Sequence, residues 1–201
     1  MKLHWSPVSP YVRKVMIVAL ETGFAGRLER VRSVAVMSEV NASLSADNPL
    51  NKLPTLVCDD GRVLFDSCVI CEFLDPEGIL HPRGFDARIC ALRRQAFGDG
   101  LLDLLILLRN ERNRPIPFQS PPHLSAWLTK AKNALDRLEA EVPGFDHQGM
   151  DIGDVSIGCA LGYLDVRFAD MAWREGRPML DRWEADISRR SSFMQTVAVV
   201  E

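Results

Sequence analysis

The chain has 201 residues, of which 47% are hydrophobic, a proportion typical of globular proteins and large enough for a core. The formal net charge of −3 provides no positive excess that would favour nucleic acid or acidic lipid as a partner. No apolar run approaches the roughly 18–20 residues that span a membrane, and the N-terminus has no signal-peptide pattern. We therefore expect a cytoplasmic protein of one or two domains with no nucleic-acid and no membrane partner.

Cysteine and histidine usage bears on disulfides and metals. Five cysteines, an odd number in a chain of this length, argue against a disulfide framework, and we expect reduced and mostly buried thiols. The histidines lie far from one another and from any cysteine pair with ligand spacing, so no metal site is expected. The residues concerned are Cys58, Cys68, Cys71, Cys90 and Cys159, with His4, His81, His123 and His147.

The first elements are a strand, a tight loop and a helix. Residues 1–5 are short and partly apolar, which predicts a strand. Two prolines interrupt residues 6–10, so this stretch cannot be helical throughout. Apolar residues then recur at helical spacing, with Pro10 suited to the first turn and Gly23 suited to the stop. We expect a helix whose N-terminus lies near Ser9.

A hairpin and a third-helix cap follow in the next sixty residues. Strands are expected at residues 28–34, 53–58 and 62–65, with a short helix or loop at residues 37–46. Asp59, Asp60 and Gly61 form a strong hairpin turn between the last two strands. Asp66 and Ser67 are a helix-cap pair before the next apolar run. The resulting order is βαβ followed by ββα.

Beyond residue 85 every strong pattern is helical. Residues 76–84 hold prolines and glycines with few apolar side chains, which indicates a linker between domains. Helices are expected at residues 89–108, 124–142, 154–168 and 178–187. The third of these is apolar nearly all round and should be the buried centre of its domain. The chain is thus predicted to have an α/β domain over residues 1–78 and an all-helical domain over residues 85–201.

Three local motifs occur in an order that resembles the cytosolic glutathione S-transferases. They are the run from Ser9 to Lys14, the run from Asn48 to Pro54 with the later Phe65, Asp66 and Ser67, and the run from Asp151 to Ser156. Among subgroups, the chain is most similar to small bacterial members with serine at the active position. The resemblance implies a thioredoxin-like, glutathione-binding N-terminal domain followed by an all-α C-terminal domain.

The resemblance makes Ser9 the catalytic candidate. A free thiol has a pKa of roughly 8.5. The Ser9 hydroxyl would donate a hydrogen bond to the glutathione sulfur and so favour the nucleophilic thiolate. The spacing of four residues from Ser9 to Arg13 is the one seen in serine-type members. A plain helix cap is the structural alternative for Ser9, and Ser6 is the alternative hydrogen-bond donor.

The same resemblance assigns glutathione binding to Lys52, Leu53, Pro54, Asp66 and Ser67. A cis Leu53–Pro54 bond would turn the Leu53 backbone outward, where it pairs with a bound peptide as an added strand does. Ser67, at a helix N-terminus, would receive the γ-glutamyl carboxylate. The family more often has Glu or Gln where this chain has Asp66. Lys52 is either a contact for the glycine carboxylate or an exposed lysine.

The remaining assignments concern the acceptor and the structural motifs. The second-substrate pocket is expected near Tyr11, Asp103 and Leu107. The arginines at the end of the long helix, Arg109, Arg112 and Arg114, either bind an acidic second substrate or form a solvated face. The Cys68 and Cys71 pair is interpreted as packing rather than redox chemistry. Asp151 with Asp154 is interpreted as a capping motif.

The implied function is a glutathione transferase of detoxification type, with glutathione as co-substrate, no metal, and a small-molecule electrophile as acceptor. The family also implies a homodimer, and the excess of apolar residues on the long helix agrees with it. Two alternatives remain. One is a non-catalytic glutathione-binding or regulatory protein that keeps the fold, and the other is a glutathione-dependent reductase or isomerase.

Overall fold

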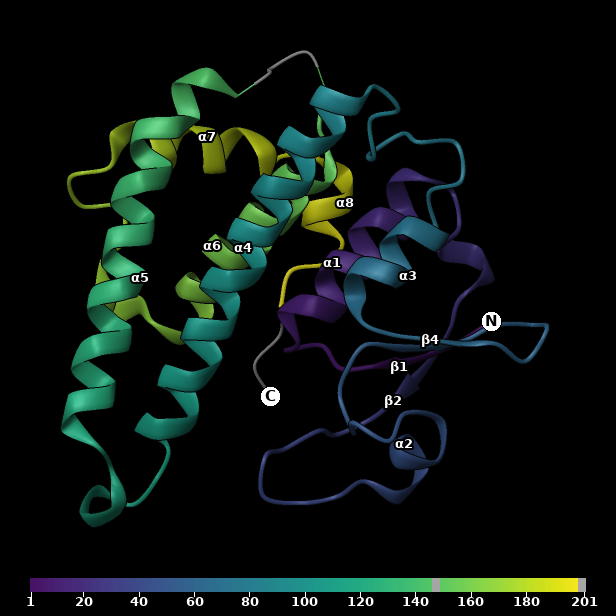
Figure 1. Cartoon of the computed structure of the whole chain (residues 1–201), viewed down its shortest axis with the longest axis horizontal. Helices are drawn as coiled ribbons and strands as arrows, with labels where there is room; N and C mark the ends of the chain where they lie inside the picture. Colours follow the sequence, from purple (N-terminus) through teal and green to yellow (C-terminus); the bar gives the residue numbers. More distant parts are fainter. Residues whose placement is uncertain (146–148, 199–201) are drawn as a thin grey trace. The chain divides into compact units, whose positions relative to one another are not determined.

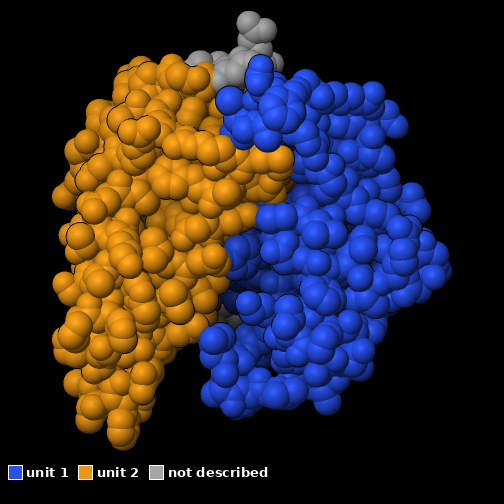
Figure 2. Space-filling view, in the orientation of Figure 1, with its two compact units in different colours: residues 1–91, 191–201 blue, residues 92–190 orange. Residues whose placement is uncertain are grey.

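The computed structural model describes residues 1–145 and 149–198. The chain divides into two compact units, Met1–Ala91 with Ser191–Glu201, and Leu92–Arg190 (Figure 2). The predicted helical domain at residues 85–201 includes residues 146–148 and 199–201, which lie outside the described part. The long helix begins in the first unit and continues into the second.

The first unit is a four-stranded sheet with helices. Its elements are β1 (Lys2–Trp5), α1 (Pro10–Glu21), η1 (Ala25–Arg27), β2 (Glu29–Arg32), α2 (Ala42–Asp47), β3 (Thr55–Val57), β4 (Val63–Leu64), α3 (Ser67–Phe73) and α8 (Ser191–Met194). The strand order is β2-β1-β3-β4, with β1 parallel to β2 and antiparallel to β3, and β3 antiparallel to β4. Helices α1 and α3 lie on one side of the sheet and α2 on the other (Figure 1). The predicted order of strands and helices is confirmed.

Local turn chemistry sets the limits of these elements. Gly23 follows the end of α1 with a φ of 78°, a left-handed conformation that glycine adopts without strain. In the hairpin, the backbone N–H of Gly61 donates to the carbonyl of Cys58 at 3.0 Å, and Gly61 has a φ of 85°. Both elements therefore turn where the sequence predicts.

Helix α8 was not among the predicted elements. Its Phe193 is 1% exposed, and the guanidinium of Arg13 in α1 lies 5.5 Å from the centre of its ring. The hydroxyl of Ser192 donates to the Glu21 carboxylate at 2.5 Å. The segment that sequence analysis placed in the helical domain thus packs on α1 of the first unit.

The second unit is entirely helical. Its elements are α4 (Phe85–Arg112, whose first turns belong to the first unit), η2 (Ile116–Phe118), α5 (Pro121–Glu141), η3 (Val142–Gly144), α6 (Ile152–Arg167), η4 (Ala169–Met171) and α7 (Pro178–Ile187). Every residue of α6 from position 152 to position 161 is buried, which confirms its prediction as the central helix. A methyl group on Gly98 of α4 would lie 2.6 Å from the carbonyl carbon of Ser156. The missing side chain therefore lets α4 and α6 approach closely.

The described residues include all five cysteines and most of the possible metal ligands. None of these five described cysteines forms a disulfide; Cys58, Cys71 and Cys159 are buried and Cys90 is exposed, which confirms mostly buried thiols. In the described ranges no group of three or more His, Cys, Asp or Glu side chains could hold a metal ion. None of the helices in this part of the chain is long and apolar enough to cross a membrane.

Candidate functional site

Ser9 caps helix α1. Its backbone is extended, with φ −83° and ψ 118°, and its hydroxyl oxygen accepts a hydrogen bond from the Val12 N–H at 3.3 Å. Pro10 follows at the start of the helix, where a missing N–H leaves no bond unmade. A serine hydroxyl can accept and donate at the same time. The bond from Val12 therefore leaves the Ser9 proton available to donate to another atom.

Asp66 and Ser67 form the start of α3. One carboxylate oxygen of Asp66, Oδ1, accepts from the backbone N–H of Cys68 at 2.9 Å, while the side chain as a whole is exposed. Over the described residues, its other oxygen has no hydrogen-bond partner. Ser67 is buried, at 3% exposed. The peptide bond before Asp66 is cis, which the sequence did not predict.

A fully buried lysine connects α1 with the start of α3. Lys14 is 0% exposed, and its ammonium donates to the sulfur of Cys68 at 3.6 Å. The ring of Tyr11 lies 6.0 Å from the same ammonium. Since Cys68 directly follows Ser67, Lys14 holds the first turn of α3 against α1. Sequence reasoning gave Lys14 no role, although a lysine on the apolar face of a helix is unusual.

The predicted loop before β3 is fixed by a buried asparagine. Asn48 is 0% exposed and donates to the hydroxyl of Thr55 at 2.9 Å and to the carbonyl of Lys52 at 3.3 Å. The Leu53–Pro54 bond is cis, as the resemblance implies. The Lys52 side chain is exposed, and Pro54 is buried. Asn48 positions this loop, and sequence analysis used it only as part of a motif.

The predicted site residues fall into two groups. Ser9, Tyr11, residues 52–54 and residues 66–67 all belong to the first unit. Asp103 and Leu107 lie one turn apart on α4 in the second unit, and both are exposed. The second-substrate pocket, which draws on both groups, stays a prediction.

The predicted capping motif at α6 is confirmed as a complete capping box. The Asp151 carboxylate accepts from the N–H groups of Gly153 at 2.8 Å and Asp154 at 3.2 Å, and the Asp154 carboxylate accepts from the Asp151 N–H at 2.9 Å. The guanidinium of Arg94 in α4 also binds the Asp151 carboxylate. Both acids are thus occupied by the protein itself.

A charged network around the buried Asp75 and His81 follows the end of α3. Burial alone would raise the pKa of Asp75, but hydrogen bonds from the His81 ring and from the N–H groups of residues 79–81 lower it overall. The other ring nitrogen of His81 lies 3.5 Å from Glu72, which accepts from Arg88 of α4 at 2.8 Å. The predicted linker is therefore tied to the helices on either side of it.

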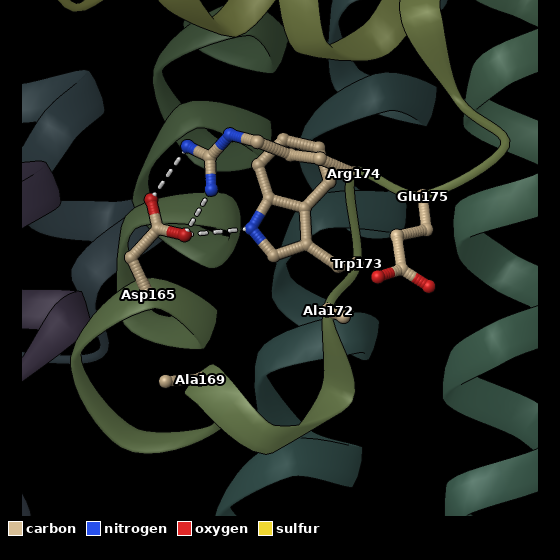
Figure 3. Close-up of a pocket in the computed structure, with 6 residues that line it drawn as sticks. All are labelled: Asp165, Ala169, Ala172, Trp173, Arg174 and Glu175. Atoms are coloured by element: carbon tan, nitrogen blue, oxygen red, sulfur yellow. Dashed lines mark hydrogen bonds and ion pairs between the residues drawn. The ribbon is translucent and has the colours of Figure 1, made fainter.

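One pocket, of about 240 Å³, lies wholly in the second unit (Figure 3). It is lined by Asp165, Ala169, Ala172, Trp173, Arg174 and Glu175. Asp165 accepts from the Trp173 indole at 2.8 Å and from Arg174 at 2.8 Å, and Arg174 also binds Asp181 and Glu184. These bonds, with Asp165 as the main cause, raise the pKa of Arg174. Because the guanidinium of Arg174 already binds three carboxylates of the protein, we assign this pocket no ligand.

Known proteins with similar sequences identify the family of this chain. The model of the glutathione S-transferase N-terminal domain matches residues 8–77, and that of the C-terminal domain matches residues 121–186. The chain is 30% identical to the uncharacterized GST-like protein YibF of Escherichia coli K12 over 98% of both chains. The chain belongs to the glutathione S-transferase family.

Solved structures of family members agree. A glutathione transferase family member from Pseudomonas fluorescens Pf-5, with bound glutathione, has a TM-score of 0.92 and 38% identity, covering 99% of both chains. A structure from the same organism with bound S-(propanoic acid)-glutathione has a TM-score of 0.90 and 37% identity, covering 100% of both chains. The fold is therefore the thioredoxin-like domain followed by the helical domain that the resemblance implied.

Proposed function

We propose that this protein is a glutathione transferase that activates the glutathione thiol with Ser9 and joins it to a small electrophile. The observation that carries the proposal is the Ser9 hydroxyl, whose oxygen is engaged by the Val12 N–H while its proton remains available. Relatives at 37–38% identity hold glutathione or a sulfur-substituted glutathione, which supports the same ligand here.

In the proposed reaction, the Ser9 O–H donates to the glutathione sulfur and favours the thiolate over the thiol. The thiol proton leaves to solvent. The thiolate then attacks an electrophilic carbon, a carbon–sulfur bond forms, and the electron pair displaced from that carbon goes to a leaving group or to the adjacent atom of an activated double bond. Serine itself forms no covalent intermediate.

Glutathione binding is proposed for the start of α3 and the loop before β3. The buried Ser67 would donate to the γ-glutamyl carboxylate of glutathione. The unoccupied oxygen of Asp66 would accept from the ammonium group of the same γ-glutamyl residue. The Leu53 backbone would pair with the peptide, Pro54 would shape the loop, and Lys52 would meet the glycine carboxylate. Tyr11, Asp103 and Leu107 are the proposed acceptor contacts.

Two substitutions separate binding from chemistry. Ser67→Ala should weaken glutathione binding by about ten- to a hundredfold, because a hydrogen bond to a charged group is lost. Ser9→Ala should leave binding nearly intact, lower the turnover, and move the pH–rate profile to higher pH. Ser120→Ala is the matched control, since Ser120 caps α5 without a side-chain hydrogen bond.

Binding is measured by calorimetry, and turnover by conjugation of a generic aromatic halide, with melting temperatures as a check on folding. Full activity and an unshifted profile in Ser9→Ala would show that Ser9 is only a helix cap. Glutathione binding without conjugation by the unmutated protein would favour the binding-protein alternative.

We also propose a cytoplasmic homodimer that serves in detoxification, as the family suggests. Helix α4 leaves large apolar side chains exposed, among them Phe85 at 78% and Ile89 at 50%. Burial of such side chains is the usual driving force for a stable dimer. A sedimenting species of 22.5 kDa at micromolar concentration would contradict the dimer.

A further inference from the structure

Helices α4 and α6 run parallel and side by side along their whole shared length. Arg94, ten residues into α4, binds Asp151 at the N-cap of α6, and Arg112, the last residue of α4, binds Asp170 in η4 just after α6, at 3.0 Å. In each pair the second residue lies 57 or 58 positions further along the chain. This constant offset places Arg109, one turn before the end of α4, level with Arg167, the last residue of α6.

Tyr163 lies one turn before the level of these two arginines, and the charges of both act on its hydroxyl. It is 4% exposed and sits one turn before Arg167 on α6, so the two side chains share a face of the helix. Burial raises the pKa of Tyr163, and the charges of Arg109 and Arg167, with a hydrogen bond from Arg109, act in the opposite direction. Two guanidinium groups therefore approach one buried phenol.

Neither arginine is neutralised by the protein. Arg109 and Arg167 are both half-buried, and within the described ranges no carboxylate lies within 4.0 Å of either. The Nε of Arg167 is buried and has no hydrogen-bond partner. Neighbouring arginines differ: Arg112 binds Asp170, and Arg174 binds three acids. Partly desolvated positive charges of this kind are stabilised when an anion joins them.

We propose that Arg109, Arg167 and the hydroxyl of Tyr163 bind the carboxylate of a small organic acid. A guanidinium presents parallel N–H groups that match the two oxygens of a carboxylate, and the phenol adds a third donor. All three groups come from α4 and α6 of the second unit. The proposal therefore stands whether or not the chain transfers glutathione.

The test measures binding of benzoate and of its neutral analogue benzamide to the full chain, by calorimetry at low salt and without glutathione. Benzoate should bind and raise the melting temperature, while benzamide should bind at least about tenfold more weakly. Arg109→Met and Arg167→Met should each weaken benzoate binding by about ten- to a hundredfold, and Tyr163→Phe by about tenfold.

Arg189→Met is the matched control, because it removes the same charge from an exposed pair with Asp186 and should leave benzoate affinity unchanged. Removal of one of two like charges should not lower the melting temperature of the unliganded protein, so Arg109→Met and Arg167→Met remain measurable. Equal binding of benzoate and benzamide, or wild-type affinity in both arginine variants, would overturn the site. Displacement of benzoate by equimolar sulfate would overturn its assignment to carboxylates.

Discussion

Helices α3 and α6 both begin with an aspartate N-cap, yet one start is open and the other is closed. At α6, Asp151 accepts from two backbone N–H groups and from Arg94, and Asp154 returns a bond to the cap. At α3, Asp66 accepts one backbone N–H and is otherwise exposed. The same local pattern therefore supports folding where its acceptors are saturated and remains available to a ligand where they are not.

The largest expected effect comes from the packing that closes the start of α6. In an ordinary helix Gly→Ala stabilises by roughly 1 kcal/mol. Gly98→Ala should instead destabilise the protein by about 3 kcal/mol or more, because the new methyl group would meet the backbone of Ser156 at 2.6 Å. Gly100→Ala, with nothing within 4 Å, is the control and should raise the melting temperature. Chemical denaturation measures the unfolding free energy of both variants. A Gly98→Ala variant as stable as Gly100→Ala would refute the close contact.

The next effect distinguishes charge from capping at the closed start. Asp151→Asn keeps a capping side chain but leaves Arg94, whose side chain is 13% exposed, with only the more distant Asp154 carboxylate at 3.9 Å. We expect a loss of about 2 kcal/mol, less than the 3–5 kcal/mol typical of a fully buried pair. Asp151→Ala removes the cap as well and should cost about 1 kcal/mol more. An unfolding free energy unchanged in Asp151→Asn would show that Arg94 adds nothing to the cap.

The fold was predictable where short-range chemistry decides it. Ser9, Gly23, the turn at Gly61 and the Asp151 capping box each act within four residues, and each gave a correct element limit. The central helix was predictable because it is apolar on all sides.

What the sequence did not predict depends on contacts between distant residues. Helix α8 has only four residues and is held by Arg13 and Glu21, about 170–180 positions earlier. The role of Lys14 likewise depends on Cys68, which is 54 positions away. Hydrophobic periodicity cannot predict such pairs, because it describes only the residues of one helix or strand. The site residues were named through the family motifs, and their roles stay proposals.

A smaller effect on stability is expected at the open start of α3. Asp66→Asn should leave the unfolding free energy unchanged, since asparagine caps as well as aspartate, whereas Asp66→Ala should cost about 1 kcal/mol. Both should weaken glutathione binding by about tenfold if the carboxylate meets the ammonium of the ligand. Calorimetry with glutathione checks the affinity. Normal affinity in Asp66→Asn would mean that the open oxygen faces only water, and the contrast with Asp151 would then concern stability alone.

The smallest expected effect is a pH dependence in the second unit, where Glu141 of α5 is saturated as Asp151 is. Hydrogen bonds from Arg93 and, less strongly, Arg137 lower the pKa of Glu141 from 4.5 to about 2. A carboxyl group whose pKa is lower in the folded than in the unfolded chain stabilises the fold above the unfolded value. This contribution should be complete above about pH 4.5 and disappear as the pH falls through about 2.

The side chains of Arg93 and Arg137 are 53% and 65% exposed, so solvent screens both pairs. Glu141→Gln should therefore cost about 1 kcal/mol at neutral pH. The difference from wild type should shrink towards pH 2 and in high salt. Glu175→Gln, at an exposed glutamate without an ion pair in the described part of the chain, should show no such dependence. If the unfolding free energies of wild type and Glu141→Gln differed by the same amount at every pH from 7 to 2, the two arginines would not lower the pKa of Glu141 on folding.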